Sequence, residues 1–217
     1  MLWGVGSPRT MRPHWALHEL SLPYQTEAIA ARSGETQTAT FAALNPRQKI
    51  PVLQDGDITI AESPAIVSYL AEVYSRGDAQ LLPTQQRKRA QWLEWGFFIT
   101  MELDATTLYV VRRHSILKHI YGEAPAAVEN ARAYFYRQLG HVDQVLRGDG
   151  PFLMGGEFTA ADILLTTCLT WAMTLDAPIY DSCRTYLERI TMRNAYSAAS
   201  AANARKAPKT DLIAPRA

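Results

Sequence analysis

Cysteine is scarce in this sequence, and neither cysteine stands where redox chemistry would need one. The 217 residues contain only Cys168 and Cys183, both within apolar or amphipathic helical patterns rather than beside a turn or a histidine. A reactive thiol needs a setting that lowers its pKa, such as the start of a helix. We therefore interpret both as buried or idle thiols of a reducing compartment and expect no chemistry through a protein cysteine.

The sequence also lacks an excess of one charge, a long apolar run and a targeting segment. Its formal net charge is +1 with no block of like charges, which argues against a nucleic-acid or membrane-surface partner. No stretch reaches the roughly 18 uninterrupted apolar residues of a membrane helix, and the start, MLWGVGSPRT, lacks a basic and long apolar signal. We expect a globular protein of the cytoplasm, with a sizeable core from its 47% hydrophobic residues.

The first third of the chain alternates between strand and helix patterns. The expected elements are a strand at 2–6, a helix at 10–20, a strand at 24–30, a weak helix at 38–44, two short strands and a further helix. Because proline is tolerated only in the first turn, the first helix should begin between Arg9 and Pro13. The order βαβ followed by ββα predicts a four-stranded mixed sheet of the thioredoxin-like, α/β arrangement.

The character of the chain changes after Tyr74. The stretch SRGDAQLLPTQ is short and polar and contains glycine and proline, so we expect a first domain at 1–75, a linker at 76–85 and a second domain at 86–217. Apolar residues at helical spacing predict an all-α second domain. Its expected helices are one long helix at 86–117, then 125–146, a central helix capped by Thr159 and Asp162, 179–192 and 195–204, before a loose tail at 206–217.

The most informative motif is KIPVL at 49–53, followed by an Asp-Gly turn and a helix entered through Glu-Ser-Pro at 62–64. The pattern predicts a hairpin whose strand opens at Pro51, which leaves the backbone of Ile50 to bond something other than the sheet. Ser63 is a good N-cap, with proline as the first helical residue. Because a helix N-terminus favours negative charge, this segment predicts a site for a carboxylate or phosphate.

These residues also carry a family resemblance. The segment NPRQKIPVLQDGDITIAESPAIVSYLAEVY resembles the glutathione-binding half of cytosolic glutathione S-transferases. SPRTMRPHWALHEL is similar to the first helix and active-site loop of bacterial-type members with a serine, and FTAADILL to the capping motif in the core of the helical domain. The resemblance covers nearly the whole chain. It implies a thioredoxin-like domain followed by an all-α domain.

The resemblance implies that glutathione is a co-substrate held by this motif. Glu62 would pair with the glutamyl ammonium, and Ser63 would take the glutamyl carboxylate at the helix N-terminus. Ile50 would hold the cysteinyl backbone as an added strand beside a cis Pro51. The remaining candidates for glutathione binding are Gln48 and Lys49, which would reach the glycyl carboxylate, and Arg9 in the first-helix loop.

The group that activates the glutathione thiol has several candidates. In serine-type members a hydroxyl near the end of the first strand donates to the sulfur, and here Ser7 and Thr10 are the two hydroxyls, with Arg9 or a backbone N–H as alternatives. The tyrosine of the alpha, mu and pi types and the cysteine of the beta and omega types are missing. Trp3 stands at the nearest aromatic position, where an indole N–H is its only donor.

The resemblance also places a pocket for the electrophile on the long helix, at Tyr109, Arg112 and Arg113, where a basic wall would suit an acidic or phosphate-bearing molecule. His14 and His18 stand at i and i+4, but no third ligand is near. We read them as helix surface or a domain contact and assign no metal.

Three functions are consistent with these residues. The first is conjugation of the glutathione thiolate to a small electrophile. The second is a glutathione-dependent isomerase of the zeta (maleylacetoacetate isomerase) type, which rests on the Ser7 spacing and lacks the Ser-Ser-Cys run. The third is a non-catalytic binding or regulatory protein of the same fold. The resemblance and the long apolar helix predict a two-fold homodimer.

Overall fold

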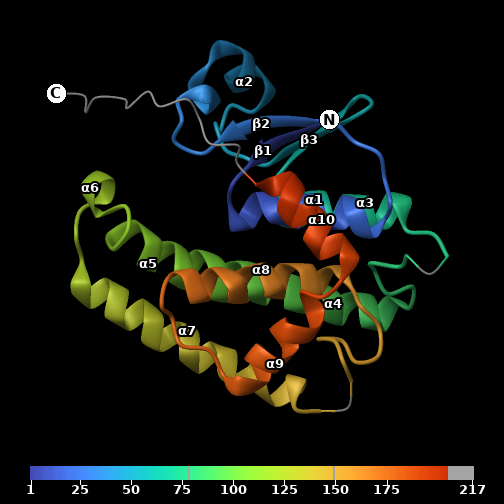
Figure 1. Ribbon diagram of the computed structural model, residues 1–217, viewed down its shortest axis with the longest axis vertical. Coiled ribbons are helices and arrows are strands. Elements are labelled where there is room, and N and C mark those ends of the chain that lie inside the picture. The colour runs from blue at the N-terminus through green and yellow to red at the C-terminus, as the bar shows by residue number, and fades with distance from the viewer. Residues whose placement is uncertain (78, 149, 205–217) are drawn as a thin grey trace.

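A mixed four-stranded sheet forms the upper layer of the computed structural model, which describes residues 1–77, 79–148 and 150–204 (Figure 1). The strand order is β2-β1-β3-β4, with β1 parallel to β2 and the other pairs antiparallel. The strands span Leu2–Val5 (β1), Thr26–Ala30 (β2), Val52–Asp55 (β3) and Ile58–Ala61 (β4). The short helices η1 (Glu35–Gln37) and α2 (Ala39–Leu44) follow β2. The expected thioredoxin-like sheet is therefore confirmed.

Helix α1 spans Pro8–Glu19 and begins earlier than the sequence predicted. The Ser7 hydroxyl accepts the Thr10 N–H, and the Thr10 hydroxyl accepts the Ser7 N–H. This capping box starts the helix at Pro8, just ahead of the predicted range from Arg9 to Pro13. Pro13 consequently lies in the helix interior, where it has no N–H to donate to the Arg9 carbonyl. The prediction that Pro13 must fall in the first turn was wrong, because the cap outweighs the loss of one hydrogen bond.

The hairpin and helix α3 follow the KIPVL motif as expected, with one correction at the helix start. The Ile50–Pro51 peptide is cis, as predicted. Helix α3 spans Ser63–Tyr74, so Ser63 is its first residue rather than its N-cap, and Glu62 occupies the N-cap position without a capping hydrogen bond. The predicted cap at Ser63 was wrong because Glu62 turns the chain at φ 72°.

The helical half contains seven α-helices and one π-helical stretch in the described residues. They are α4 (Gln86–Phe98), the π-helix η2 (Ile99–Leu108), α5 (Tyr109–His114), α6 (Lys118–Tyr121), α7 (Pro125–Leu146), α8 (Ala160–Thr174), α9 (Asp181–Ile190) and α10 (Asn194–Asn203). No helix among the described residues has the length and apolar character needed to cross a membrane.

The single long helix predicted over 86–117 is interrupted by η2 and ends at His114. The Tyr109 N–H donates to the Asp104 carbonyl, five residues back, which is the π spacing. Hydroxyls of Thr100 and Thr107 donate to carbonyls four residues earlier and compete with the backbone ladder. Periodicity alone did not show this widening, because apolar residues continue through it.

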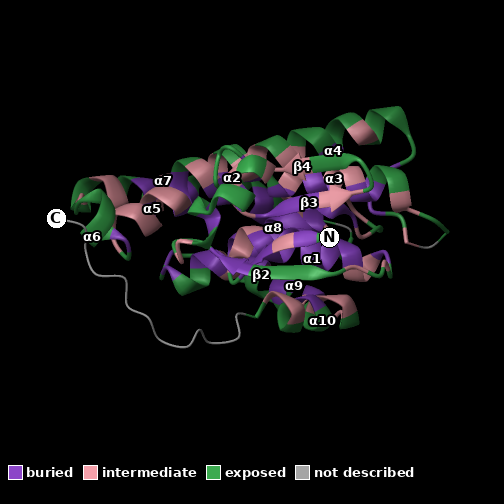
Figure 2. Ribbon diagram, turned by 90° about the horizontal axis from the view of Figure 1, so that it is seen from above, coloured by how far each residue is buried: buried purple, intermediate pink, exposed green. Residues whose placement is uncertain are grey.

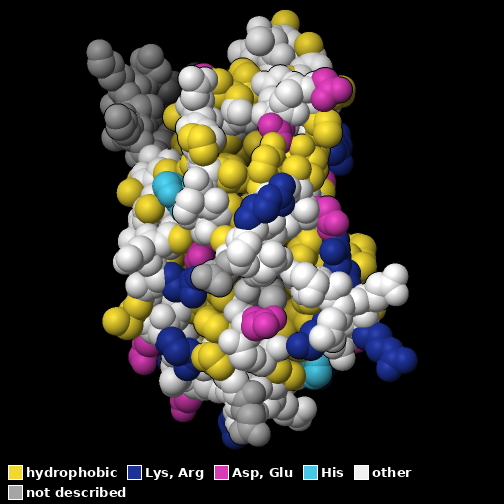
Figure 3. Space-filling view, turned by 90° about the vertical axis from the view of Figure 1, so that its right-hand side faces the viewer, with side chains coloured by type: hydrophobic (Ala, Val, Ile, Leu, Met, Phe, Trp, Pro, Cys, Tyr) yellow, Lys and Arg dark blue, Asp and Glu magenta, His cyan; other side chains and the backbone are white. Residues whose placement is uncertain are grey.

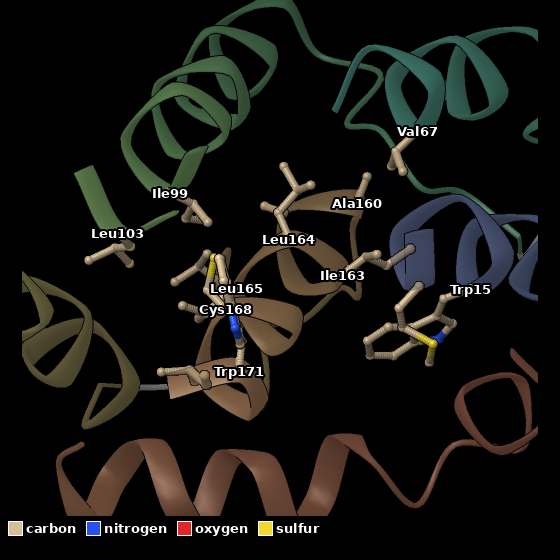
Figure 4. Packing of buried hydrophobic residues seen from close by; sticks show 14 of the residues in the cluster. Trp15, Val67, Ile99, Leu103, Ala160, Ile163, Leu164, Leu165, Cys168 and Trp171 are labelled. Carbon is tan, nitrogen blue, oxygen red and sulfur yellow. The ribbon is translucent and has the colours of Figure 1, made fainter. Parts of the chain in front are cut away.

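Helix α8 is the centre of the core, as its apolar sequence predicted. Figure 2 shows buried residues gathered on α8 and α1, with exposed faces on the outer helices. Trp15 of α1, Val67 of α3 and Ile99 belong to the same buried cluster as α8, and Figure 4 shows them around it. The predicted capping box forms, since Thr159 caps the helix and Asp162 accepts the Thr159 N–H at 2.8 Å. Burial raises the pKa of Asp162, and three other donors hold the buried carboxyl in place.

Helix α10 packs against α1, at the side of the sheet domain (Figure 1). Arg193 forms a two-pronged ion pair with Glu19 at 2.7 Å, and Tyr196 meets Trp15 edge-on at 4.9 Å. The last helix therefore binds the first. This contact crosses between the two halves of the chain. Because α3 ends at Tyr74 and α4 begins at Gln86, we propose domains at 1–75 and 86–217 with a linker at 76–85. The predicted tail at 206–217 lies outside the described residues.

Charged side chains of both signs are interspersed on the face drawn in Figure 3, with hydrophobic side chains between them. No field of one sign covers that face.

Candidate active site

A cavity of about 310 Å³ opens beside the start of α1. Three parts of the sheet domain and the helices α5, α6 and α8 contribute to its wall. The lining residues are Ser7, Pro8, Arg9, Ala31, Arg32, Thr36, Gln37, Arg47, Gln48, Lys49, Ile50, Tyr109, Arg112, Ile120, Tyr121 and Trp171. Seven of the residues predicted for the site are brought together here: Ser7, Arg9, Gln48, Lys49, Ile50, Tyr109 and Arg112. Among the lining residues that the sequence did not single out are Arg32, Tyr121 and Trp171.

The two candidate hydroxyls, Ser7 and Thr10, differ in access to this cavity. Thr10 is fully buried and does not line it, and its hydroxyl lies 2.7 Å from the side-chain oxygen of Asn203. Ser7 lines the cavity, and its hydroxyl accepts the Thr10 N–H at 3.1 Å. The Ser7 hydroxyl also lies 3.0 Å from the Thr10 hydroxyl, and either oxygen can be the donor in that contact. Because the Ser7 O–H can rotate, its proton can instead be donated to a ligand in the cavity.

Asn203, at the end of α10, closes the loop that carries Ser7. Its side-chain amide donates to the Ser7 carbonyl at 3.2 Å, and its backbone carbonyl accepts the Gly6 N–H at 2.9 Å. No pattern in the sequence indicated this residue, since the contact joins positions 196 residues apart.

Ile50 lies against β1 because Gly4 lacks a side chain. Gly4 has φ 115°, and a Cβ on it would come within 2.7 Å of the Ile50 Cβ. The Asn45 amide donates to the Lys49 carbonyl at 2.8 Å and fixes the loop just before Ile50. No backbone hydrogen bond to Ile50 is formed within the described residues, so its N–H and carbonyl can pair with an extended ligand.

Arg12 connects the start of α3 to the helical half. Its guanidinium donates to Asp104 at 2.6 Å, to Thr167 at 2.9 Å and to Ser63 at 3.2 Å. Ser63 is buried and accepts from Arg12, so its own proton is left to donate to a ligand at the helix N-terminus. Sequence reasoning assigned Arg12 no role in the site and missed this one.

Asp104 is the buried acid that balances this cluster. Its carboxylate also receives Arg9, whose Nε lies 3.2 Å from Oδ1. Burial would raise the pKa of Asp104, but Arg12 and Arg9 outweigh it and hold that pKa below its usual value. Asp104 was missed from the sequence, although an acid within the apolar pattern of 99–108 was a usable signal.

Ser63 and Glu62 line a second hollow, of about 460 Å³, which also includes Arg9, Arg12 and Asp104. Glu62 lies at its rim, and an ion pair of 3.1 Å joins it to Arg47. Both side chains are about three-fifths exposed, which makes this an exchangeable contact of small energetic weight.

The aromatic and basic residues of α5 are arranged around Tyr109. Its ring lies between the guanidinium groups of Arg9, at 4.4 Å, and Arg113, at 4.9 Å. Arg113 also stacks on Tyr121 and does not line the cavity, whereas Arg112 does. The remaining aromatic candidate, Trp3, donates its indole N–H to Gln54 at 2.7 Å and is occupied there.

The two histidines of α1 bind neighbours rather than forming a free surface pair. His14 is fully buried between Tyr24, at 2.8 Å, and the Gly4 carbonyl, at 3.2 Å, so the reading of helix surface was wrong for it. Burial lowers the pKa of His14 to about 4. Among the described residues, no group of three or more His, Cys, Asp or Glu is placed to hold a metal.

Both cysteines are buried and free, and burial raises the pKa of Cys168 to about 12 and that of Cys183 to about 11. Neither thiol is a ready nucleophile at neutral pH.

Comparison with known proteins agrees with this architecture. The family model of the glutathione S-transferase N-terminal domain matches residues 1–72, and that of the C-terminal domain matches residues 125–189. The glutathione S-transferase-like protein gedE of Aspergillus terreus is 30% identical over 183 residues, which cover 80% of this chain and 77% of that protein. Glutathione S-transferase F14 of Arabidopsis thaliana is 30% identical over 156 residues, which cover 69% of this chain and 59% of that protein.

Solved structures show the same fold. A bacterial glutathione S-transferase, BphK, in a ternary complex superposes with a TM-score of 0.78 at 26% identity, covering 93% of this chain and 98% of BphK. The theta-class enzyme of Xanthomonas axonopodis pv. citri, with glutathione bound, has a TM-score of 0.75 at 26% identity, covering 90% and 94%. The chain belongs to the glutathione S-transferase family.

Proposed function

We propose that this protein conjugates the thiolate of glutathione to an electrophilic small molecule. The observation that carries the proposal is that Arg9 lines both hollows, so the two hollows adjoin. The donor Ser7, the unpaired backbone of Ile50 and several cations line one, and Ser63 with Glu62 lines the other. Glutathione has an ammonium and a carboxylate at one end, an extended backbone and thiol in the middle and a second carboxylate, which match these groups in order. Glutathione bound in the Xanthomonas relative supports this assignment.

The residues predicted to bind glutathione then have the following roles. Ser63 takes the glutamyl carboxylate, Glu62 turns from Arg47 to the glutamyl ammonium, and the Ile50 backbone pairs with the cysteinyl residue across the turn at Pro51. Gln48 and Lys49 face the glycyl carboxylate. Arg9 is committed to Asp104 and acts as a positioning residue for the loop.

Ser7 donates to the sulfur and favours the thiolate. Lowering a thiol pKa from about 8.5 to about 6.5 requires near 2.7 kcal/mol. One charge-assisted hydrogen bond of about 1.5–3 kcal/mol, with about 0.3–1 kcal/mol from the N-terminus of α1, is sufficient. The sulfur then forms a bond to the electrophilic carbon, and the leaving group departs with the electron pair of the bond that breaks. Thr10, buried behind Ser7, orients its hydroxyl.

Three measurements separate conjugation from the isomerase and the non-catalytic alternatives. Conjugation requires thiolate absorbance to form at neutral pH in the complex and a conjugate to appear with an activated aryl chloride. A bound but unshifted thiol would support a binding protein. Turnover of a cis-unsaturated diketo acid without conjugation would support an isomerase.

Removing the acid at the rim should weaken glutathione binding. We expect Glu62→Ala to raise the Kd for glutathione about tenfold, because a charge-assisted contact to the ammonium is worth roughly 1.5–3 kcal/mol and water replaces part of it. Isothermal titration calorimetry measures the change. Glu123→Ala is the control, since that exposed acid pairs with Lys118 and lines neither hollow. Unchanged affinity in Glu62→Ala would show that Glu62 does not bind the glutamyl ammonium and would contradict the proposed orientation of glutathione.

We also propose a homodimer through the outer face of α4 and η2. Leu93, Phe97 and Met101 follow one another at intervals of four and are 46%, 67% and 56% exposed. They border the hollow that contains Ser63, so a second copy would shield the glutamyl end of the site.

Placing a charge on this stripe should separate the subunits. We expect Phe97→Asp to give a monomer by light scattering at micromolar concentration, whereas Met192→Asp, at an 81% exposed position on another surface, should keep the wild-type mass. A monomeric wild-type protein would refute the dimer.

A further inference from the structure

Every charged residue that lines the cavity beside Ser7 is a cation. These residues are Arg9, Arg32, Arg47, Lys49 and Arg112, and no aspartate or glutamate lies among the lining residues. In the neighbouring hollow, by contrast, Glu62 and Asp104 accompany two arginines. The excess of positive charge is therefore confined to one of the two compartments.

Two of the five cations are neutralised within the protein. Asp104 binds Arg9, and Glu62 pairs with Arg47. Arg32, Lys49 and Arg112 form no ion pair with a carboxylate in the described part of the chain. A bound glutathione thiolate would bring two negative charges to this cavity, at the sulfur and at the glycyl carboxylate. One positive charge of these three is left over. Glu62 releases Arg47 when it turns to the glutamyl ammonium, but the Arg47 side chain is about three-fifths exposed, so water and salt screen its charge.

Arg112 is the cation placed to bind one further anion. It is half-buried, and its guanidinium makes no hydrogen bond with the described residues. Burial, together with the nearby guanidinium groups of Arg32 and Arg9, lowers its pKa. A position in the last turn of α5 explains a preference for a cation there, but not a cation turned into a cavity beside another arginine. An anion between them would relieve this repulsion.

The walls around Arg112 suit a flat molecule. Tyr109, Tyr121 and Trp171 line the same cavity as Arg112. Because Arg9 and Arg113 already lie over the Tyr109 ring, a flat ligand would meet the edge of Tyr109 and the rings of Tyr121 and Trp171. A planar ligand can stack there while a carboxylate on its edge meets Arg112 in a two-pronged contact.

We infer that the electrophile used by this protein is an aromatic or conjugated molecule with a single carboxylate, which Arg112 binds. This inference rests on the proposed conjugation and defines its substrate class. In a model reaction the thiolate sulfur forms a bond to the chlorine-bearing ring carbon of 4-chloro-3,5-dinitrobenzoate. Chloride leaves with the electron pair of the C–Cl bond, and the carboxylate stays on the product. Arg112 is thus a specificity-determining residue.

The test uses two conjugates that differ only in the carboxylate. They are the glutathione conjugates of 4-chloro-3,5-dinitrobenzoate and of 2-chloro-1,3-dinitrobenzene, prepared without the enzyme. Titration calorimetry should show the carboxylated conjugate binding wild type at least about tenfold more tightly, the effect of one charge-assisted contact. Arg112→Met should lose this preference and keep its affinity for the uncharged conjugate within about threefold. Arg112→Lys should restore part of it.

A matched control and the catalytic readout complete the test. Arg137→Met, which removes an arginine stacked on Tyr134 of α7, should leave the preference unchanged. Equal binding of the two conjugates by wild type, or a preference that survives in Arg112→Met, would overturn the inference. A preference that depends on Arg112 without turnover of either aryl chloride would support the anion site and contradict the proposed conjugation.

Discussion

Replacing Asp104 with asparagine should lower the free energy of unfolding by about 3–5 kcal/mol. The Asp104 and Arg12 side chains are each only 2% exposed, and Asp104 also binds Arg9. Asparagine keeps the shape but leaves a buried guanidinium without its counter-charge. Urea unfolding at neutral pH measures the loss. Glu123→Gln, in an exposed ion pair, should change stability by less than about 0.5 kcal/mol.

The effect should also depend on pH. Because the folded protein holds the pKa of Asp104 below its unfolded value, this carboxylate stabilises the fold above about pH 3.9 and loses that contribution as the pH falls through the folded pKa. Wild type and Asp104→Asn should therefore converge in acid. Arg12→Met with Asp104→Leu should recover much of the loss, since an apolar pair of similar volume leaves no fully buried charge and Arg9, whose side chain is 35% exposed, can turn to water. A full loss in the double variant would show that the ion pair is not the cause.

Ser7→Ala should reduce turnover with an activated aryl chloride about 10²-fold while leaving the Kd for glutathione nearly unchanged. Loss of one preorganised donor to a developing charge typically has this effect. The bound thiol should then titrate near its ordinary value, which thiolate absorbance in the complex measures. Retention of full activity would assign the donor to Arg9 or a backbone N–H.

The substitution also removes the cap of α1, so a control for stability is needed. Thr159→Ala removes the equivalent hydroxyl of the other capping box, at α8 and outside both hollows. Each change should cost about 1 kcal/mol of stability. Only Ser7→Ala should affect the thiol, and an equal loss of turnover in Thr159→Ala would attribute the effect to destabilisation.

The parts of the fold that could be predicted are those determined by residues close together in the sequence. The cis Pro51 was expected from the family resemblance, but the hairpin at KIPVL and the capping box of Thr159 and Asp162 each depend on residues within about a turn or two of one another. Local chemistry determines them. The start of α1 was misplaced because a rule about Pro13 was given more weight than the cap at Ser7.

The site was only partly predictable because its supporting contacts join distant segments. The KIPVL loop was found from adjacent residues, and Ser7 became a candidate, beside Thr10 and Arg9, through the family resemblance. Asp104 reaches Arg12 across 92 positions and Asn203 reaches Ser7 across 196, and no single-sequence pattern encodes such pairs. Asp104 also depends on η2, whose wider turn cannot be read from apolar spacing.

The contacts between Asn203 and the Ser7 loop can form only after α10 has been synthesised. The sheet, α1 and the KIPVL loop all lie before residue 75, so a growing chain can form them early in synthesis. The loop at Ser7 lacks its bonds from Asn203 until the ribosome has added that residue and α10 has docked beside α1. A nascent chain stalled before α10 should therefore hold a folded sheet with an unfinished version of the proposed thiol site, so that competence to handle a reactive thiol arrives only after α10 has been synthesised and has docked.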